Sequence, residues 1–297
     1  MLLTRPITFF AGKGGVGKTT MAAAHALAAA DAGHRTLVVS TDPAHSLGDA
    51  FETRLADRPR RIAEGLWAAE PDADAAVRRR VRQVEDDAAA ALPRAIMPAV
   101  RRHLDHASAG PGMTESALID LLTGYLAEVP AKWDRLIVDS APTGHLLRMI
   151  ALPSLLAPWI HGLTRRRERV VAADRFAEAV VGGPESEPDP LLERLHRRRR
   201  RLTEAADRLR DDAEVRLVLV PRRMVLAETE RAADALDEGG FTLGRVVLNQ
   251  IAVDADPVLL ARIAQRFARP GIVRYGAASA EPTGFARLRE LVARVPE

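Results

Sequence analysis

A glycine-rich stretch near the start of the chain carries residues that could bind phosphate. Residues 12–19 read GKGGVGKT and match the pattern G-x-x-x-x-G-K-[ST]. Glycines let successive backbone N–H groups turn toward phosphate oxygens, and a helix that begins at the loop adds its partial positive charge. We therefore predict that Lys18 reaches the β- and γ-phosphates of ATP and that the Thr19 hydroxyl ligates Mg²⁺. The residues expected to contact the nucleotide are Gly12, Gly14, Gly15, Val16, Gly17, Lys18, Thr19 and Thr20.

Lysine is scarce outside this loop. The chain has only three lysines, Lys13, Lys18 and Lys132, among its 43 basic residues, and the others are arginines. Because a compact ammonium and a planar guanidinium are not equivalent, two lysines within one loop mark positions that need the ammonium. Lys13 cannot serve its own loop in the way that Lys18 does. The simplest alternative is that Lys13 is a solvated residue on the loop surface.

The order K-G-G-x-G-K-[ST], read here as KGGVGKT over residues 13–19, resembles the deviant P-loop class. This class includes the ParA and MinD ATPases, the nitrogenase iron proteins and the arsenite-pump ATPases. Its signature lysine reaches across a homodimer interface to the phosphates held by the other subunit. The resemblance therefore implies a homodimer with two ATP molecules between its subunits, in which Lys13 acts in trans.

Two aspartates follow apolar runs that we expect to be strands. Asp42 comes after residues 36–40 (TLVVS), and Asp139 lies at the end of residues 135–140 (RLIVDS). Parallel sheets bind ligands at the carboxyl ends of their strands. Asp42 is therefore placed to orient or activate an attacking water, with Pro43 stiffening the turn, and Asp139 to hold Mg²⁺ directly or through water. The alternative for both is an ordinary turn or capping aspartate.

The stretches around these aspartates resemble one branch of the class. Residues 41–51 (TDPAHSLGDAF) and 139–150 (DSAPTGHLLRMI) are similar to switch I and switch II of the ArsA-like family, the arsenite-pump and tail-anchored-protein-targeting ATPases, also called anion-transporting ATPases. Ser140 and Leu146 stand where threonine is typical. Within switch II, residues 141–145 (APTGH) are expected to form a loop that changes shape when the γ-phosphate leaves.

The resemblance extends over nearly the whole chain. Residues 66–76 and 226–236 are similar to family segments, and Asn249 in residues 246–251 (VVLNQI) matches an asparagine that hydrogen-bonds the adenine base. The family hydrolyses ATP by in-line attack of water. The resemblance implies Asp42, Lys13 and Lys18 as catalytic residues, and Thr19 and Asp139 as the residues at Mg²⁺.

The chain also departs from the family. Residues 274–288 keep Glu281 and Gly284 but lack the earlier proline of the adenine-side loop, so adenine contacts from residues 274–281 are not defined. The chain has no cysteine, which excludes the shared zinc site of the eukaryotic targeting factors and the arsenite-binding thiolates of the pump. The duplication of the pump is absent, so two active sites require a homodimer.

The elements that must position these residues alternate between strands and helices. Besides residues 7–10, 36–40 and 135–140, the apolar runs 215–220, 245–250 and 271–275 are expected to be buried strands, and residues 18–32 a helix that ends at Gly33. This order predicts an α/β fold: a mostly parallel P-loop NTPase sheet with helices on both faces. Two helical stretches, about residues 73–128 and 147–210, are interpreted as one inserted helical subdomain, and an expected surface loop at 182–190 interrupts the second stretch. The predicted division is an ATPase core of residues 1–72, 129–152 and 211–297 and a subdomain of residues 73–128 and 153–210.

Composition restricts the class of protein. The 297 residues are 47% hydrophobic and carry a formal charge of +3, from 43 basic and 40 acidic residues, which argues against a nucleic-acid binder. No apolar stretch is expected to approach the roughly 20 residues that span a bilayer, and no signal peptide is evident. We therefore expect a cytoplasmic protein.

Three roles for ATP hydrolysis stay open. Apolar helices at residues 91–100 and 152–163 could form a groove for a hydrophobic client or a membrane partner, although ordinary helical core is the alternative for each residue. The family name also suggests an ATPase that energises an anion efflux pump of the arsenite type. The arginine runs 165–167 and 197–201 raise a third role, an ATP-switched scaffold or nucleic-acid partner, although interleaved acids favour a solvated helix face.

Overall fold

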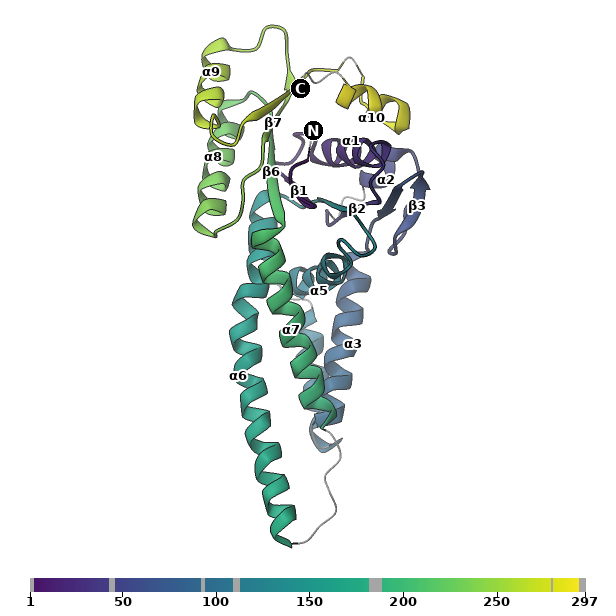
Figure 1. Ribbon diagram of the computed structural model, residues 1–297, viewed down its shortest axis with the longest axis vertical. Coiled ribbons are helices and arrows are strands. Elements are labelled where there is room, and N and C mark those ends of the chain that lie inside the picture. Colours follow the sequence, from purple (N-terminus) through teal and green to yellow (C-terminus); the bar gives the residue numbers. More distant parts are fainter. Residues whose placement is uncertain are drawn as a thin grey trace. The chain divides into compact units, whose positions relative to one another are not determined.

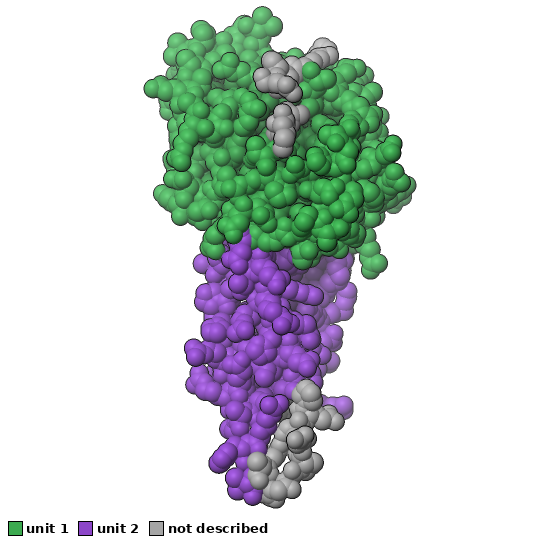
Figure 2. All heavy atoms as spheres, in the orientation of Figure 1, with its two compact units in different colours: residues 1–73, 124–149, 208–297 green, residues 74–123, 150–207 purple. Residues whose placement is uncertain are grey.

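The computed structural model describes residues 3–42, 46–91, 94–108, 113–181, 189–278 and 280–293 (Figure 1). Pro43 and residues 182–188 of the predicted loop lie outside the described residues. Contacts group the chain into two compact units (Figure 2). We call residues 1–73, 124–149 and 208–297 the sheet unit, and residues 74–123 and 150–207 the helical unit.

An eight-stranded sheet forms the centre of the sheet unit. Its order is β3-β4-β2-β5-β1-β6-β7-β8, and every neighbouring pair is parallel except β3 and β4. The predicted α/β fold with a mostly parallel sheet is confirmed, and each of the six predicted strands forms to within two residues. The strands are β1 Ile7–Ala11, β2 Thr36–Ser40, β3 Arg60–Ala63, β4 Leu66–Ala69, β5 Arg135–Asp139, β6 Ala213–Leu219, β7 Val246–Ile251 and β8 Ile272–Gly276.

Helices on both faces of the sheet explain why its central strands are continuously apolar (Figure 1). All five residues of β1 and of β2 are buried. The alanine-rich α1 packs against β1, β2 and β5. The helices of this unit are α1 Lys18–Asp31, α2 Ser46–Phe51, α8 Arg223–Glu238, α9 Pro257–Arg266 and α10 Gly284–Ala293.

The edge strand β3 was not predicted. It has the sequence RRIA, pairs antiparallel with β4, and its two arginines are exposed. Charged residues at a sheet edge prevent pairing with other chains, but they also remove the apolar signal by which strands are recognised in a sequence. The mixed pairing at this edge therefore could not be read from the hydrophobic pattern.

The helical unit is built largely from long helices (Figure 1). Salt bridges join α3 to α7 through Asp87 and Arg194, and α6 to the start of α7 through Arg167 and Asp189. The helical elements that contribute residues to this unit are α3 Ala73–Ala91, the 3₁₀ turn η1 Arg94–Ile96, α4 Met97–Ser108, α5 Met113–Ala127, α6 Thr143–Val181 and α7 Pro190–Asp211.

Helix α6 begins earlier than predicted. Thr143, Gly144 and His145 lie in its first turn, so the prediction that residues 141–145 form a loop is wrong for these three. The carbonyl of Pro142 accepts hydrogen bonds from the N–H groups of His145 and Leu146, at 2.8 and 3.3 Å. A proline immediately before a helix sacrifices no helical hydrogen bond, so it favours a helix start here.

The expectation that no apolar stretch is long enough to span a bilayer is also corrected. Within the described residues, one helix is long and apolar enough by length and composition, residues 143–177 of α6, and the mean hydropathy of its window is 1.3. Of that window, 28% is buried. The same length and composition occur in core helices of proteins that never enter a membrane, so this is weak evidence for a membrane span.

Candidate nucleotide site

The glycine-rich loop connects the end of β1 to the start of α1. Gly12 and Gly17 have φ angles of 153° and 92°, in the region that favours glycine. A Cβ atom at Gly12 would lie 2.3 Å from the Val218 carbonyl oxygen, and one at Gly17 would lie 2.5 Å from Asn249 Nδ2. The Val218 backbone therefore excludes a side chain at Gly12. At Gly17 the positive φ angle and the Asn249 side chain together disfavour one. Such a loop leaves its backbone N–H groups free to surround an anion.

Lys18 and Thr19 are the first two residues of α1. Lys18 is only 6% exposed, and its Nζ donates to the Lys13 carbonyl oxygen at 3.4 Å. Thr19 Oγ1 lies 2.9 Å from Ser46 Oγ. Both side chains thus lie beside the loop and the helix N-terminus, where a bound phosphate would meet them. The remaining predicted contacts are arranged around them: Gly14 and Gly15 are exposed, Val16 is buried, and Thr20 is half-buried in α1.

Asp139 is the most unusual group at this edge of the sheet. It ends β5, is fully buried, and its Oδ2 accepts a hydrogen bond from Ser40 Oγ at 3.1 Å. Its Oδ1 has no hydrogen-bond partner among the described residues. Burial raises the pKa of Asp139 to about 7, although hydrogen bonds from Thr19 and Ser40 and the charge of Lys18 lower it.

The surroundings of Asp139 fit a divalent cation. A buried carboxylate oxygen without a hydrogen bond is costly, and Mg²⁺ prefers oxygen ligands. The Thr19 hydroxyl lies close enough to influence the pKa of Asp139 through a hydrogen bond. Asp139 and Thr19 could therefore hold Mg²⁺ together with phosphate oxygens and waters.

Asp42 lies next to this pair. Its backbone N–H donates to Ser40 Oγ at 3.2 Å, the same hydroxyl that donates to Asp139. The neighbouring Thr41 N–H donates to the Asp139 carbonyl oxygen at 2.8 Å. Asp42 is half-buried, and its charge contributes to the raised pKa of Asp139. The structure thus brings together two aspartates that are far apart in the sequence.

Lys13 points away from its own loop. Its Nζ forms a salt bridge with Glu228 of α8 at 3.5 Å, and 41% of its side chain is exposed. The two loop lysines therefore differ sharply in environment: Lys18 is buried against the loop backbone, whereas Lys13 is held at the surface by a carboxylate.

Asn249 supports the loop in this structure. It is buried at the end of β7, and its Nδ2 donates to the Val16 carbonyl oxygen at 2.9 Å. The amide therefore fixes the loop where Gly17 approaches it most closely. Its role toward an adenine base stays a prediction, as do the contacts from residues 274–281.

The sequence analysis missed Ser40 and Glu228 at this site. Ser40 offers a weak signal, because it is a polar residue that ends a buried strand one position before the switch I pattern. Glu228 offers none, since its contact with Lys13 joins residues more than 200 positions apart. Such contacts depend on the packing of α8 against the sheet.

The chain is similar to known proteins over most of its length. Residues 5–289 match the family described as anion-transporting ATPases. A putative arsenical pump-driving ATPase 2 of Aquifex aeolicus is 27% identical over 245 residues, which are 82% of this chain and 80% of that protein.

Two further relatives are longer than this chain. The arsenical pump-driving ATPase of Acidiphilium multivorum is 32% identical over 262 residues, covering 84% of this chain and 40% of that protein. ATPase GET3B of Arabidopsis thaliana is 32% identical over 260 residues, covering 81% of this chain and 62% of that protein. The chain thus spans less than two thirds of these two relatives.

Proposed function

Because this chain belongs to the family of anion-transporting ATPases, we propose that it hydrolyses ATP with Mg²⁺ as a cytoplasmic homodimer. In this proposal the nucleotide state changes the conformation of the helical unit and thereby exposes or hides a surface for a hydrophobic client, such as a membrane-protein segment. The observation that carries the proposed hydrolysis is Asp139, a fully buried carboxylate with one oxygen lacking a hydrogen bond, next to a glycine-rich phosphate loop.

Each site residue has a distinct role in the proposed reaction. Lys18 neutralises charge on the β- and γ-phosphates, while Asp42 orients or activates the water for in-line attack. Mg²⁺, held by Thr19 and Asp139, supplies further charge neutralisation when it is bound. Asn249 holds the loop and, as the resemblance implies, contacts the adenine base.

The salt bridge of Lys13 supports its proposed action in trans. Lys18 already occupies the inside of the loop, and Lys13 turns outward to Glu228. The ion pair is partly exposed, so it is worth only about 0–1 kcal/mol and can be broken when a better anion becomes available. In the proposed dimer, that anion is the phosphate chain of the ATP bound by the other subunit.

An exposed apolar row on α6 supports the client role. Leu155, Trp159, Leu163 and Val170 are all exposed, and spacings of four, four and seven residues place them on one face of the helix. Trp159 is 62% exposed and Leu155 is 68% exposed. Three of them belong to residues 152–163, the segment predicted to bind apolar clients. Arg166 and Arg167 interrupt the row between Leu163 and Val170. Exposed apolar residues on one helix face, as over residues 155–163, are typical of a surface that binds a partner helix.

The relatives give a second candidate. Two of them are named as arsenical pump-driving ATPases, which favours an ATPase that energises an anion efflux pump. The sequence has no cysteine, so an arsenite-type anion would have to be recognised without thiolates.

The Asp42→Asn substitution tests the proposed function. We expect the variant to bind ATP with Mg²⁺ normally but to lose hydrolysis, because the carboxylate acts on water and not on the nucleotide. ATP affinity is measured by calorimetry, and phosphate release by a continuous assay. Material that co-purifies with the ATP-bound variant then identifies the client. Normal turnover in Asp42→Asn would contradict the assignment.

A further inference from the structure

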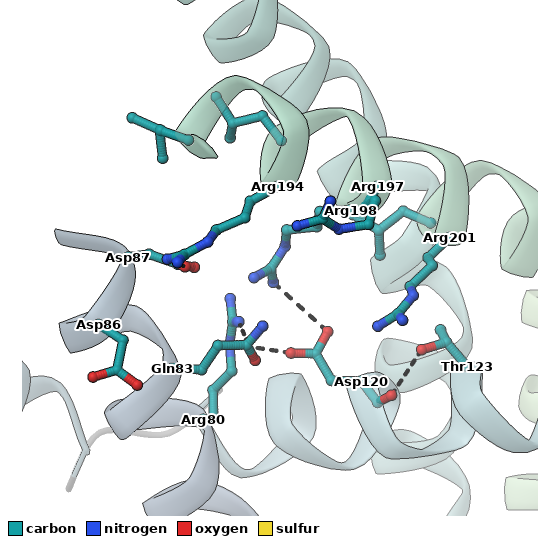
Figure 3. Close-up of a pocket in the computed structure, with 13 residues that line it drawn as sticks. Arg80, Gln83, Asp86, Asp87, Asp120, Thr123, Arg194, Arg197, Arg198 and Arg201 are labelled. Carbon is teal, nitrogen blue, oxygen red and sulfur yellow. Dashed lines mark hydrogen bonds and ion pairs between the residues drawn. The ribbon is translucent and has the colours of Figure 1, made fainter. Parts of the chain in front are cut away.

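The helical unit contains a cavity that the proposed ATPase site does not use. It has a volume of about 420 Å³ and lies between α3, α5 and α7 (Figure 3). Five arginines line it: Arg80, Arg194, Arg197, Arg198 and Arg201. The volume is within the range of small-molecule sites.

The arginines outnumber the acids of the cavity wall. Three aspartates line it, Asp86, Asp87 and Asp120, so the formal charge of the wall is five minus three, or +2. Asp87 pairs with Arg194 at 2.7 Å, and Arg197 pairs with Glu193 at 3.5 Å. With Glu193 counted, five arginines face four acids, so one positive charge is left uncompensated.

A single carboxylate serves two of the arginines. Asp120 of α5 lies 3.1 Å from Arg80 Nε and 3.6 Å from the nearest Arg198 nitrogen. Arg201 also points into the cavity (Figure 3), and among the described residues no carboxylate forms an ion pair with it. Three guanidinium groups therefore face the same space, with one shared counter-ion between two of them.

Burial makes this arrangement costly without a further anion. Only 11% of the Arg80 side chain is exposed, and burial lowers its pKa. The charges of Asp120 and Asp87 oppose this shift, whereas the charge of Arg198 adds to it. The Nε of Arg198 is buried and has no hydrogen-bond partner among the described residues. A buried donor on a charged group that lacks a hydrogen bond destabilises the fold, because its desolvation is not compensated. An acceptor within the cavity would remove this cost.

We propose that this cavity binds a small molecule that carries a phosphate group. A phosphate has a charge of about −1.5 to −2 at neutral pH, opposite in sign to the excess charge of the wall. Guanidinium forks bind phosphate oxygens in pairs. Among the described residues that line the cavity none is aromatic, so they offer no surface on which a nucleobase would stack. Their apolar members are Leu191, Leu195 and Leu202. Inorganic phosphate or a sugar phosphate therefore fits better than a nucleotide.

The test is a calorimetric titration of the full chain with inorganic phosphate and, separately, with glucose 6-phosphate. Both titrations use the Lys18→Ala variant as well as the unsubstituted chain, because the P-loop also binds phosphate. We expect binding of at least one probe to persist in Lys18→Ala, at constant ionic strength. Loss of all binding in Lys18→Ala would overturn the proposal, because the binding would then belong to the P-loop.

Two arginines of α7 provide a matched pair for the same titration. Both Arg200 and Arg201 are exposed, but only Arg201 lines the cavity. In the Lys18→Ala background, Arg201→Gln should weaken phosphate binding about tenfold, because one hydrogen bond from a charged donor is lost. Arg200→Gln should leave phosphate binding unchanged. Arg198→Gln should also weaken it. Equal weakening by Arg200→Gln and Arg201→Gln, or preference for an acidic peptide without phosphate, would contradict the assignment.

Discussion

Lys13 and Lys18 belong to one loop but have opposite environments. Lys18 is buried against the loop backbone, and Lys13 lies at the surface in a salt bridge with Glu228. This difference is consistent with the separate roles that we propose: Lys18 binds the phosphates of its own subunit, and Lys13 completes the site of another. This difference leads to a first prediction at the scale of the residue.

Replacing Lys13 by alanine should separate binding from turnover. We expect Lys13→Ala to keep most of its ATP affinity but to lose about 10³-fold or more in turnover, because a cation supplied to the transferred phosphoryl group acts mainly in the transition state. Lys132→Ala is a matched control, since Lys132 is exposed and pairs with Glu128. ATP affinity and steady-state hydrolysis are measured for both. Equal losses in both quantities, or no loss in either, would reject the role of Lys13.

His25 of α1 is a buried histidine in the packing behind the loop. Its Nδ1 lies 2.8 Å from the Met21 carbonyl oxygen. The centroid of its ring lies 4.9 Å from that of the Phe10 ring, and the two rings are tilted by 47°. Burial, together with the charge of Arg216, lowers the pKa of His25 to about 3. The folded protein therefore keeps this imidazole neutral at a pH where the unfolded chain protonates it.

This histidine predicts a pH dependence of stability. Between pH 6.5 and about 3 the unfolded chain binds one more proton than the folded protein, so stability is complete above pH 6.5 and falls by up to about 1.4 kcal/mol per pH unit below it. His25→Gln, which keeps a donor for the Met21 carbonyl, should remove this part of the dependence. Urea unfolding of both proteins at pH 7.5 and 5.0 measures it. If the two proteins lost equal stability between these pH values, His25 would not be the titrating group.

The residues that could be predicted are those with local signals. The loop residues 12–19 form a short pattern that is recognisable without knowledge of the fold, and Asp139 ends a clear apolar run. The orphaned oxygen of Asp139 and the salt bridge from Lys13 to Glu228 required the structure, because both depend on which elements pack side by side. The arginine-lined cavity likewise could not be predicted from the arginine run 197–201, because such a run is equally typical of a solvated helix face.

Among the elements, α6 would serve both proposed functions along one helix. The helix begins at Thr143, four residues after Asp139, and its later turns carry the exposed apolar row. An adjacent face of the helix, about 100° from this row, carries Ile160, Thr164 and Val171 and is buried. A client bound to the row would therefore contact the same helix that begins next to the nucleotide site.

The apolar row can be tested independently of hydrolysis. Replacing Leu155 and Trp159 together by glutamine should weaken binding of an apolar helical peptide at least tenfold, since each large side chain contributes about 1.5–3 kcal/mol when it is buried in a complex. Basal ATP hydrolysis should not change, because neither residue packs in the core. Binding is followed by fluorescence anisotropy of a labelled peptide. Val253→Gln is the control, a fully exposed apolar residue of the sheet unit. Unchanged peptide affinity in the double variant would contradict the proposed surface.

The elements differ in how well the sequence predicts them. Buried strands such as β1 and β2 are continuous apolar runs and were predicted to within one residue. The edge strand β3 was missed because its arginines remove the apolar signal. The predicted start of α6 was too late in the sequence because Pro142 and Gly144 were interpreted as parts of a loop. Propensity alone does not distinguish a proline that precedes a helix from one that lies in a loop.

For the whole molecule, the central claim is that one subunit completes the active site of another. In the proposed dimer, each site takes Asp42 and Lys18 from one chain and Lys13 from the second chain. If the claim holds, the two variants expected to be inactive, Lys13→Ala and Asp42→Asn, should restore ATPase activity when they form a dimer with each other. In a mixed dimer, the site on the Lys13→Ala chain has its own Asp42 and receives Lys13 from the Asp42→Asn chain.

The most direct test is the ATPase activity of these two variants after mixing. In an equimolar mixture with full subunit exchange, half of the dimers contain one chain of each variant, and one of the two sites in each such dimer is complete. The mixture should therefore recover about a quarter of the unsubstituted activity, although each variant alone is inactive. Sedimentation with ATP and Mg²⁺ verifies that dimers have formed. If the mixture forms dimers but stays as inactive as its components, Lys13 acts within its own subunit and the account is wrong.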